Sequence, residues 1–118
     1  MALARDANNN VVQALQPIDG TLQRLTPAAG TASPAAVLQA PGRACVVAVR
    51  VRTVTGIAHF RAGPANVAAA VTDFPITSDD GWMLFSLTGK TGADKKVATH
   101  VSIFAEAANI SVDIVEME

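Results

Sequence analysis

The sequence predicts an all-β protein: an antiparallel β-sandwich, jelly-roll-like, of about six to eight short strands, with an extended N-terminal arm. Two observations predict the sheets. Apolar and polar side chains alternate with a period of two over several short segments, and those segments are rich in valine and isoleucine. A third observation predicts the sandwich, because turn signals separate the segments and no helical period lies between them.

Residues 1–41 lack this alternation and form the predicted arm. The segment contains three consecutive asparagines, breakers at Pro17 and Gly20, and a run rich in Ala, Pro, Gly, Ser and Thr over residues 26–34. Such a composition buries too little apolar surface to offset the entropy of ordering the chain. We therefore expect a boundary near residue 41, a β-sandwich domain over residues 42–118, and a domain that still folds without residues 1–35.

Residues 43–54 contain the first predicted strand. Its odd positions, among them Cys45 and Val47, make one apolar face, and a buried free cysteine acts there as a small hydrophobe. Arg50 and Arg52 project from the opposite face with smaller apolar side chains. That face is either solvated or a protein contact, since arginine is enriched at interfaces, and the sequence alone does not separate the two.

Five further strands are expected in the rest of the domain. Each is a short run with alternation or a mostly apolar composition, and each is bounded by glycine, proline, aspartate or serine. They are expected within residues 57–62, 67–71, 82–87, 97–104 and 110–115. A polar loop over residues 88–96 separates the last two strands from the others.

Composition excludes several classes of partner. The chain of 118 residues has one cysteine, so it forms no internal disulfide, and its net charge of −1 gives no basic footprint for nucleic acid. No run reaches the roughly 18 apolar residues of a membrane span, and the charged first residues are unlike a signal peptide. The core must consist of small and β-branched side chains, so we expect the fold to gain stability from assembly.

We expect no catalytic residue, no cofactor and no metal site. His59 and His100 are the only histidines, and their spacing matches no metal-ligand motif. An enzyme would need the fold to bring His59, His100 and Asp113 together. Residues 88–91 imitate the end of a phosphate loop but lack its earlier glycine and its helix. Residues 78–81 favour a turn over a calcium loop.

The order of strand and turn segments after residue 42 carries a family resemblance. The segments are Arg43–Arg50, Ile57–Gly63, Thr72–Ile76, Trp82–Phe85, Thr99–Ile103 and Ile110–Glu118. Over residues 43–118 this order resembles small structural proteins of tailed bacteriophages, some of which act as capsid cement or decoration proteins. The first ten residues also resemble the beginning of such proteins. The resemblance implies no catalytic residues.

The resemblance implies a structural virion protein on the capsid exterior, made in the host cytoplasm. The sandwich would sit on the capsid, and the arm would order on binding and spread over neighbouring subunits. The implied partners are the major capsid protein and further copies of the chain, by analogy a homotrimer. The residues expected to contact neighbours are Val11, Val12, Leu15, Arg50 and Arg52.

The alternative in the same virion context is a head-fibre or tail-associated module that binds a receptor or glycan. Exposed loops such as residues 88–96 would then hold the ligand. Those residues lack the aromatic side chains that commonly stack on sugars.

Overall fold

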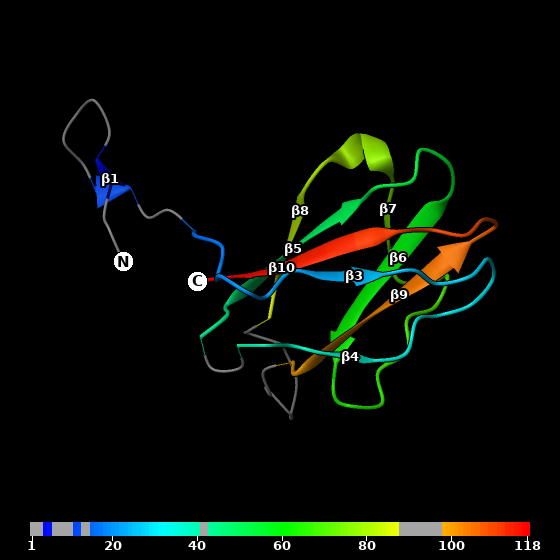
Figure 1. Ribbon diagram of the computed structural model, residues 1–118, viewed down its shortest axis with the longest axis horizontal. Coiled ribbons are helices and arrows are strands. Elements are labelled where there is room, and N and C mark those ends of the chain that lie inside the picture. The colour runs from blue at the N-terminus through cyan, green and yellow to red at the C-terminus, as the bar shows by residue number, and fades with distance from the viewer. Residues whose placement is uncertain (1–3, 6–10, 13–14, 41–42, 88–97) are drawn as a thin grey trace.

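The computed structural model describes residues 4–5, 11–12, 15–40, 43–87 and 98–118, and over these residues the protein is a β-sandwich (Figure 1). The sandwich strands are β3 (Gln23–Leu25), β4 (Ala36–Val37), β5 (Val46–Val51), β6 (Ile57–Gly63), β7 (Phe74–Ile76), β8 (Met83–Ser86), β9 (His100–Glu106) and β10 (Val112–Met117). A short 3-10 turn, η1 (Ser78–Asp80), precedes β8. The predicted all-β sandwich is confirmed.

Two four-stranded sheets make up the sandwich, and every neighbouring pair of strands is antiparallel. One sheet has the order β3-β10-β5-β8 and the other the order β4-β9-β6-β7. When the eight strands are counted from the first, the orders become 1-8-3-6 and 2-7-4-5, the arrangement of a jelly roll. The chain therefore crosses between the sheets at almost every connection.

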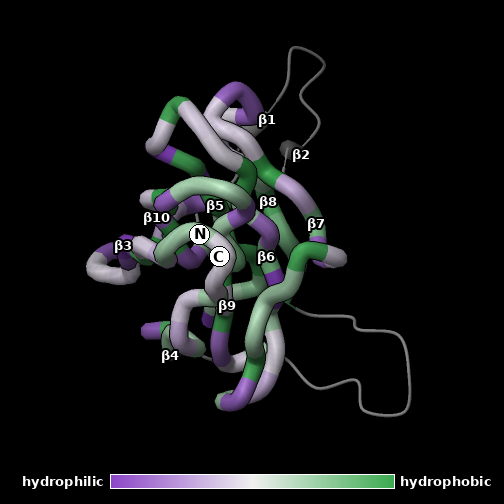
Figure 2. The backbone as a smooth tube through the Cα atoms, turned by 90° about the vertical axis from the view of Figure 1, so that its right-hand side faces the viewer, coloured by the Kyte–Doolittle hydropathy of each residue, from purple (hydrophilic) through white to green (hydrophobic). Residues whose placement is uncertain are grey.

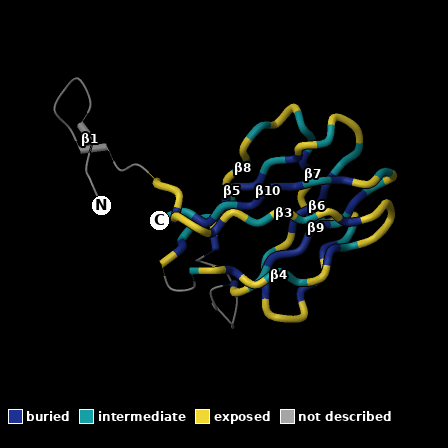
Figure 3. Tube along the Cα trace, viewed as in Figure 1, coloured by how far each residue is buried: buried dark blue, intermediate teal, exposed yellow. Residues whose placement is uncertain are grey.

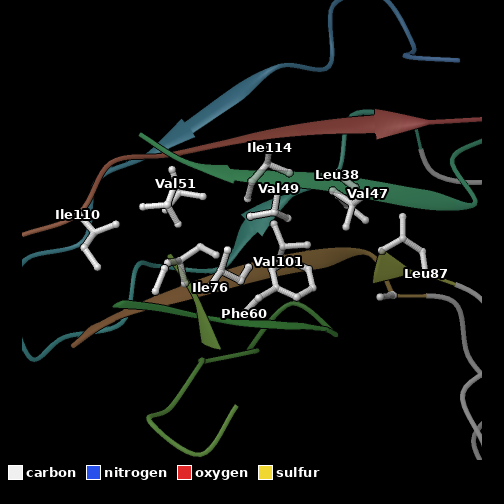
Figure 4. Close-up of a cluster of buried hydrophobic side chains, with 14 of the residues drawn as sticks. Leu38, Val47, Val49, Val51, Phe60, Ile76, Leu87, Val101, Ile110 and Ile114 are labelled. Atoms are coloured by element: carbon white, nitrogen blue, oxygen red, sulfur yellow. The ribbon is translucent and has the colours of Figure 1, made fainter. Parts of the chain in front are cut away.

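The core lies between the two sheets and is built from small and β-branched side chains, as predicted. One layer comes from β5 and β10, and the other comes from β6, β7 and β9 (Figure 4). The side chains that Figure 4 labels are Leu38, Val47, Val49, Val51, Phe60, Ile76, Leu87, Val101, Ile110 and Ile114. Apolar residues recur along the strands (Figure 2), and every residue of β5, β9 and β10 is buried or half-buried (Figure 3). Cys45, expected in the core, is instead half-buried at the start of β5, with its Sγ 3.7 Å from the carbonyl oxygen of Met117.

For residues 15–40 the predicted arm is wrong, because this segment belongs to the sandwich. β3 pairs with β10, and β4 pairs with β9. Ile18 and Leu38 are buried in the core. The buried carboxylate of Glu116 accepts hydrogen bonds from the backbone amides of Gln39 at 2.6 Å and Ala40 at 2.8 Å. The end of the chain thus holds the segment that precedes β5.

The polar residues that made this segment look like an arm are among the groups that order it. The hydroxyl of Thr21 donates to the carbonyl of Ile18 at 2.7 Å and accepts from the amide of Glu116 at 3.1 Å. The hydroxyl of Ser33 accepts from the amide of Ile103 at 3.0 Å. All of these groups are buried, so the hydrogen bonds compensate for the hydration that the groups lose on folding. Composition alone does not reveal such partners.

The remainder of the predicted arm contains a third, smaller sheet. β1 (Ala4–Arg5) pairs with β2 (Val11–Val12) as an antiparallel ribbon, which Figure 1 shows apart from the sandwich. Residues 1–3, 6–10 and 13–14 lie outside the described residues.

The strand predicted at residues 67–71 is absent, and these residues belong to the connection between β6 and β7. Val67 and Ala69 are buried, and the amide of Ala69 donates to the hydroxyl of Ser102 on β9 at 3.0 Å. Ser102 faces away from the core, yet it is fully buried. Residues 64–73 therefore cover the outer face of the β4-β9-β6-β7 sheet.

His59 fastens this connection to the sheet. Its Nδ1 lies 2.9 Å from the carbonyl oxygen of Asp73, and its Nε2 lies 2.6 Å from the carboxylate of Glu106. The Asp73 carbonyl oxygen can only accept, so Nδ1 donates to it. The histidine is buried and has a structural role in the described part of the chain.

Truncation tests the corrected boundary. A chain that begins at residue 15 keeps all eight sandwich strands and is expected to unfold as one cooperative transition. A chain that begins at residue 36 loses β3, Ile18, Thr21 and Ser33. Burial of Ile18 alone is worth about 1.5–3 kcal/mol, a large part of a typical stability of about 5–15 kcal/mol. We expect circular dichroism and urea titration to show that the second chain is unfolded. A folded product would instead show that residues 1–35 are a dispensable arm, as the sequence predicts.

Replacement of His59 tests the fastening of residues 64–73. His59→Leu removes both hydrogen bonds and is expected to cost about 1–3 kcal/mol of unfolding free energy. Amide exchange at Ala69 and Ala70 should become faster, because the connection loses its anchor. His100→Leu is the matched control, since His100 bonds only its neighbour Thr99 among the described side chains. Equal effects of the two replacements would contradict the assigned role of His59.

Candidate functional site

The two outer faces of the sandwich differ in what covers them. Residues 64–73 cover the face of the β4-β9-β6-β7 sheet. On the other sheet the outward side chains of Trp82 and Leu84 are 44% and 54% exposed. We call this second surface the open face, and it consists of Pro17, Arg24, Ala48, Arg50, Arg52, Trp82, Leu84, Asp113, Val115 and Met117.

One half of the open face is an apolar groove of about 390 Å³. Its lining residues come from β5, β8, β10 and the segments next to them: Pro17, Ala48, Trp82, Leu84, Val115 and Met117. Register explains the groove, because Leu84 and Val115 both pair with Ala48, and all three project outward. The small side chain of Ala48 leaves the floor low between larger neighbours. An exposed apolar surface of this kind marks an interaction site more often than chance.

The other half of the open face is an arginine cluster around Asp113, formed by Arg24, Arg50 and Arg52. Asp113 lies on β10, with Arg24 of β3 directly opposite on one side and Arg50 of β5 directly opposite on the other. Its Oδ1 accepts from Arg24 Nε at 2.9 Å, and its Oδ2 accepts from Arg52 Nη1 at 3.1 Å and Arg50 Nη2 at 3.5 Å. The carboxylate is 4% exposed, whereas the three arginines are about half exposed.

The cluster sets the charge state of Asp113. Burial acts to raise the pKa of Asp113, but the hydrogen bonds and positive charges of Arg24 and Arg52 outweigh it and hold that pKa below its ordinary value. The aspartate is therefore ionised at neutral pH, and three positive charges surround one negative charge.

Arg50 joins the two halves of the open face. Its guanidinium carbon lies 4.8 Å from the centroid of the Trp82 ring, within the range of a cation–π interaction. Trp82 in turn lines the apolar groove. The open face is thus one continuous surface of aromatic, aliphatic and arginine side chains, the types enriched where proteins bind one another.

The structure brings two of the five predicted contact residues into this site. Arg50 and Arg52 lie in the arginine cluster. Leu15 is 39% exposed and precedes the groove residue Pro17 along the chain. Val11 and Val12 form β2, where only the backbone is described. Contact with a neighbour remains a prediction for all five residues.

The sequence pattern does not identify Arg24, Trp82, Leu84 or the role of Asp113 as parts of the open face. Arg24 lies within the predicted arm, so the pattern does not place it beside a strand of the sandwich. Trp82 and Leu84 carried a usable signal, because two large apolar residues two positions apart share one face of a strand. Which face of the strand is exposed depends on the order of the strands in the sheets, and that order cannot be derived from the local sequence pattern.

The histidines and Asp113 do not form a site. His59 and His100 lie on adjacent strands, where His59 pairs with Phe104 and His100 pairs with Gly63, four residues further along β6. Asp113 lies on the other sheet. Residues 78–81 form the predicted turn, in which the carboxylate of Asp80 accepts from the amide of Thr77 at 2.8 Å.

Within the described ranges no group of three or more metal-ligating side chains lies together. Residues 88–91 and the loop 88–96 lie outside the described residues. No helix in the described part of the chain is long and apolar enough to cross a bilayer. Comparison with protein-family models, curated proteins and solved structures finds no match to this chain.

Asp113→Asn tests the electrostatics of the cluster. The replacement keeps the shape but removes the charge that balances three arginines, and it is expected to cost about 1–3 kcal/mol at neutral pH. Because the folded-state pKa of Asp113 lies below the ordinary value of 3.8, its contribution is fully present above that pH and disappears as the pH falls through the folded-state pKa. The two stability curves from urea titration should therefore converge in acid.

The control is Asp79→Asn, which neutralises an exposed aspartate outside the cluster. It should change the unfolding free energy by less than about 0.5 kcal/mol. A cost of Asp113→Asn that is independent of pH would contradict an electrostatic role for the carboxylate.

Proposed function

We propose that the protein is a structural virion protein that binds the outer surface of a tailed-bacteriophage capsid and stabilises it as a cement protein. The observation that carries the proposal is the open face, an apolar groove joined to an arginine cluster. No described segment covers it, whereas residues 64–73 cover the other side of the sandwich. The jelly-roll strand order supports a virion context, because this architecture recurs in viral structural domains. The resemblance over residues 43–118 supports it as well.

The open face suits a contact that is repeated many times. Trp82 and Leu84 offer apolar area, and the arginines offer charged hydrogen bonds at the rim of the same surface. Each copy would make a contact of modest affinity, and symmetry-related copies on one lattice would multiply it. The partners we propose are the major capsid protein and further copies of the chain, arranged as a homotrimer.

In this proposal residues 1–14 are the part of the predicted arm that contacts neighbouring capsid subunits. β3 and β4 belong to the sandwich, so only the segment that contains β1 and β2 is left to reach a neighbouring subunit. Val11 and Val12 lie on β2 and remain proposed contacts. In this proposal the open face supplies most of the contact with the capsid.

Capsid binding by variants of the open face tests the proposal. Capsids of the phage that encodes the chain are stripped of it and mixed with purified protein, and bound protein is measured by co-sedimentation. Trp82→Ala is expected to weaken binding about tenfold or more, as truncation of a buried interface tryptophan commonly does. The chain that begins at residue 15 should also bind more weakly than the full chain, because it lacks the proposed contacts Val11 and Val12.

Val54→Ala is the control, since Val54 is an exposed apolar residue in the β5–β6 turn and outside the open face. It should bind like the wild type. Failure of the wild-type chain to bind stripped capsids would overturn the cement function. Unchanged binding by a folded Trp82→Ala protein would instead reject the open face as the contact.

A head-fibre or tail-associated module that binds a glycan or receptor is the second candidate. The exposed ring of Trp82 favours it, because aromatic side chains stack on sugars, although the Arg50 guanidinium already lies over that ring. A glycan array with the full chain separates the two functions. Glycan binding that Trp82→Ala abolishes, without capsid binding, would support the second candidate.

A further inference from the structure

We propose that the arginine cluster is a carboxylate-binding site: it receives an aspartate or glutamate side chain of a partner protein while an adjacent apolar side chain of that partner occupies the apolar groove. This inference rests on the proposed function in taking the open face as the docking surface. It adds the chemistry of the partner, an acidic residue next to a large apolar one.

The first observation is an imbalance of charge. Arg43 is paired with Glu118, and Arg61 is paired with Asp73, so each of these arginines has a carboxylate of its own. Arg24, Arg50 and Arg52 share the single carboxylate of Asp113. Counted over these ion pairs alone, the cluster has two more positive charges than negative ones, although the chain as a whole has a net charge of −1. An acidic group of a partner would neutralise this local excess.

The second observation is the supply of hydrogen-bond donors. Each guanidinium carries five N–H groups, and the bonds to Asp113 engage one nitrogen of each arginine. Both oxygens of Asp113 are already occupied by these bonds. The Nε of Arg50 is buried and has no hydrogen-bond partner among the described residues. That nitrogen is covered, so the donors that a partner can reach lie on the half-exposed parts of the three guanidinium groups, and a carboxylate is the acceptor that matches a guanidinium.

The third observation is a space for the incoming group. Arg50 and Arg52 line a shallow hollow of about 320 Å³ together with Val51 and Ser78. The side chain of Ser78 adds a hydroxyl that can donate to an anion. A carboxylate is small enough for this hollow and would contact the edges of the guanidinium groups that Asp113 leaves open.

The fourth observation sets the apolar part of the ligand. The guanidinium of Arg50 lies over Trp82, and Trp82 lines the apolar groove, so the hollow and the groove are neighbours on one surface. The groove is lined almost entirely by carbon atoms. Nucleic acid would satisfy the arginines but not such a groove, and the net charge of −1 is unlike that of proteins that bind phosphate backbones. A protein segment satisfies both halves.

Nuclear magnetic resonance with the labelled full chain tests the inference. The acidic probe is the peptide acetyl-Glu-Leu-Glu-Leu-amide, and the matched neutral probe is acetyl-Gln-Leu-Gln-Leu-amide. The chain has one tryptophan, so the indole N–H of Trp82 is a single resonance that reports on the groove. The Nε–H resonances of Arg24, Arg50 and Arg52 report on the cluster. We expect the acidic peptide to shift both sets and to bind about tenfold or more tightly than the neutral one.

Arginine variants assign the effect to the cluster. Arg50→Gln and Arg52→Gln should each weaken the acidic peptide about tenfold and leave the neutral peptide unchanged. Arg52→Lys keeps the charge without the fork and should give an intermediate affinity. Arg43→Gln is the matched control, because Arg43 is an exposed arginine with its own partner outside the open face. Added salt should weaken the acidic peptide more than the neutral one.

Four results would overturn the inference. The first is equal affinity for the two peptides, or no shift with either at millimolar concentration. The second is an unchanged preference in folded Arg50→Gln and Arg52→Gln proteins. The third is tighter binding of single-stranded oligothymidylate than of the acidic peptide, which would identify a nucleic-acid surface. Capsid binding that depends on Trp82 but not on the arginines would remove this inference while leaving the proposed function in place.

Discussion

The structure depends on the alternation of side chains along β10, the last strand of the chain and a central strand of its sheet. β10 pairs with β3 on one side and with β5 on the other. Its inward residues Val112 and Ile114 are fully buried, and inward Glu116 binds the backbone before β5. Its outward residues begin with Asp113, which holds the arginines, and end in the floor of the apolar groove. A shift of register by one residue would exchange these two sets and destroy both core and surface.

The same strand explains how a core of small side chains suffices. Valine and alanine bury little area each, so the sandwich also uses buried polar groups that satisfy the backbone of weakly patterned segments. Glu116, Thr21 and Ser33 each bond backbone groups far away in sequence or across a turn. These bonds bring residues 15–40 into the sheets and close the jelly roll. Stability therefore depends on specific pairs as well as on apolar burial.

The two outer faces of the sandwich differ in what covers them, and this difference decides which face is proposed to bind a partner. The β6–β7 connection covers one face, with His59 and Ser102 fixing it to the sheet. Among the described residues no connection covers the other face, which keeps Trp82, Leu84 and three arginines at the surface. A face that is covered by its own chain cannot be a docking surface without rearrangement. The open face needs none, which is why the proposed contact lies there.

The sequence by itself determined the fold class, the strands over β5, β6, β8, β9 and β10, and the apolar side of β5, because period-two alternation is a local property of the chain. It also placed Arg50 and Arg52 on one outward face. Only the tertiary structure decided that residues 15–40 join the sheets, that residues 67–71 form a cover, and that Asp113 meets Arg24. Each of these depends on a partner distant in sequence: β10 for β3, Ser102 for Ala69, and strand order for the cluster. Local patterns carry no information about such partners, so composition alone favoured a free arm.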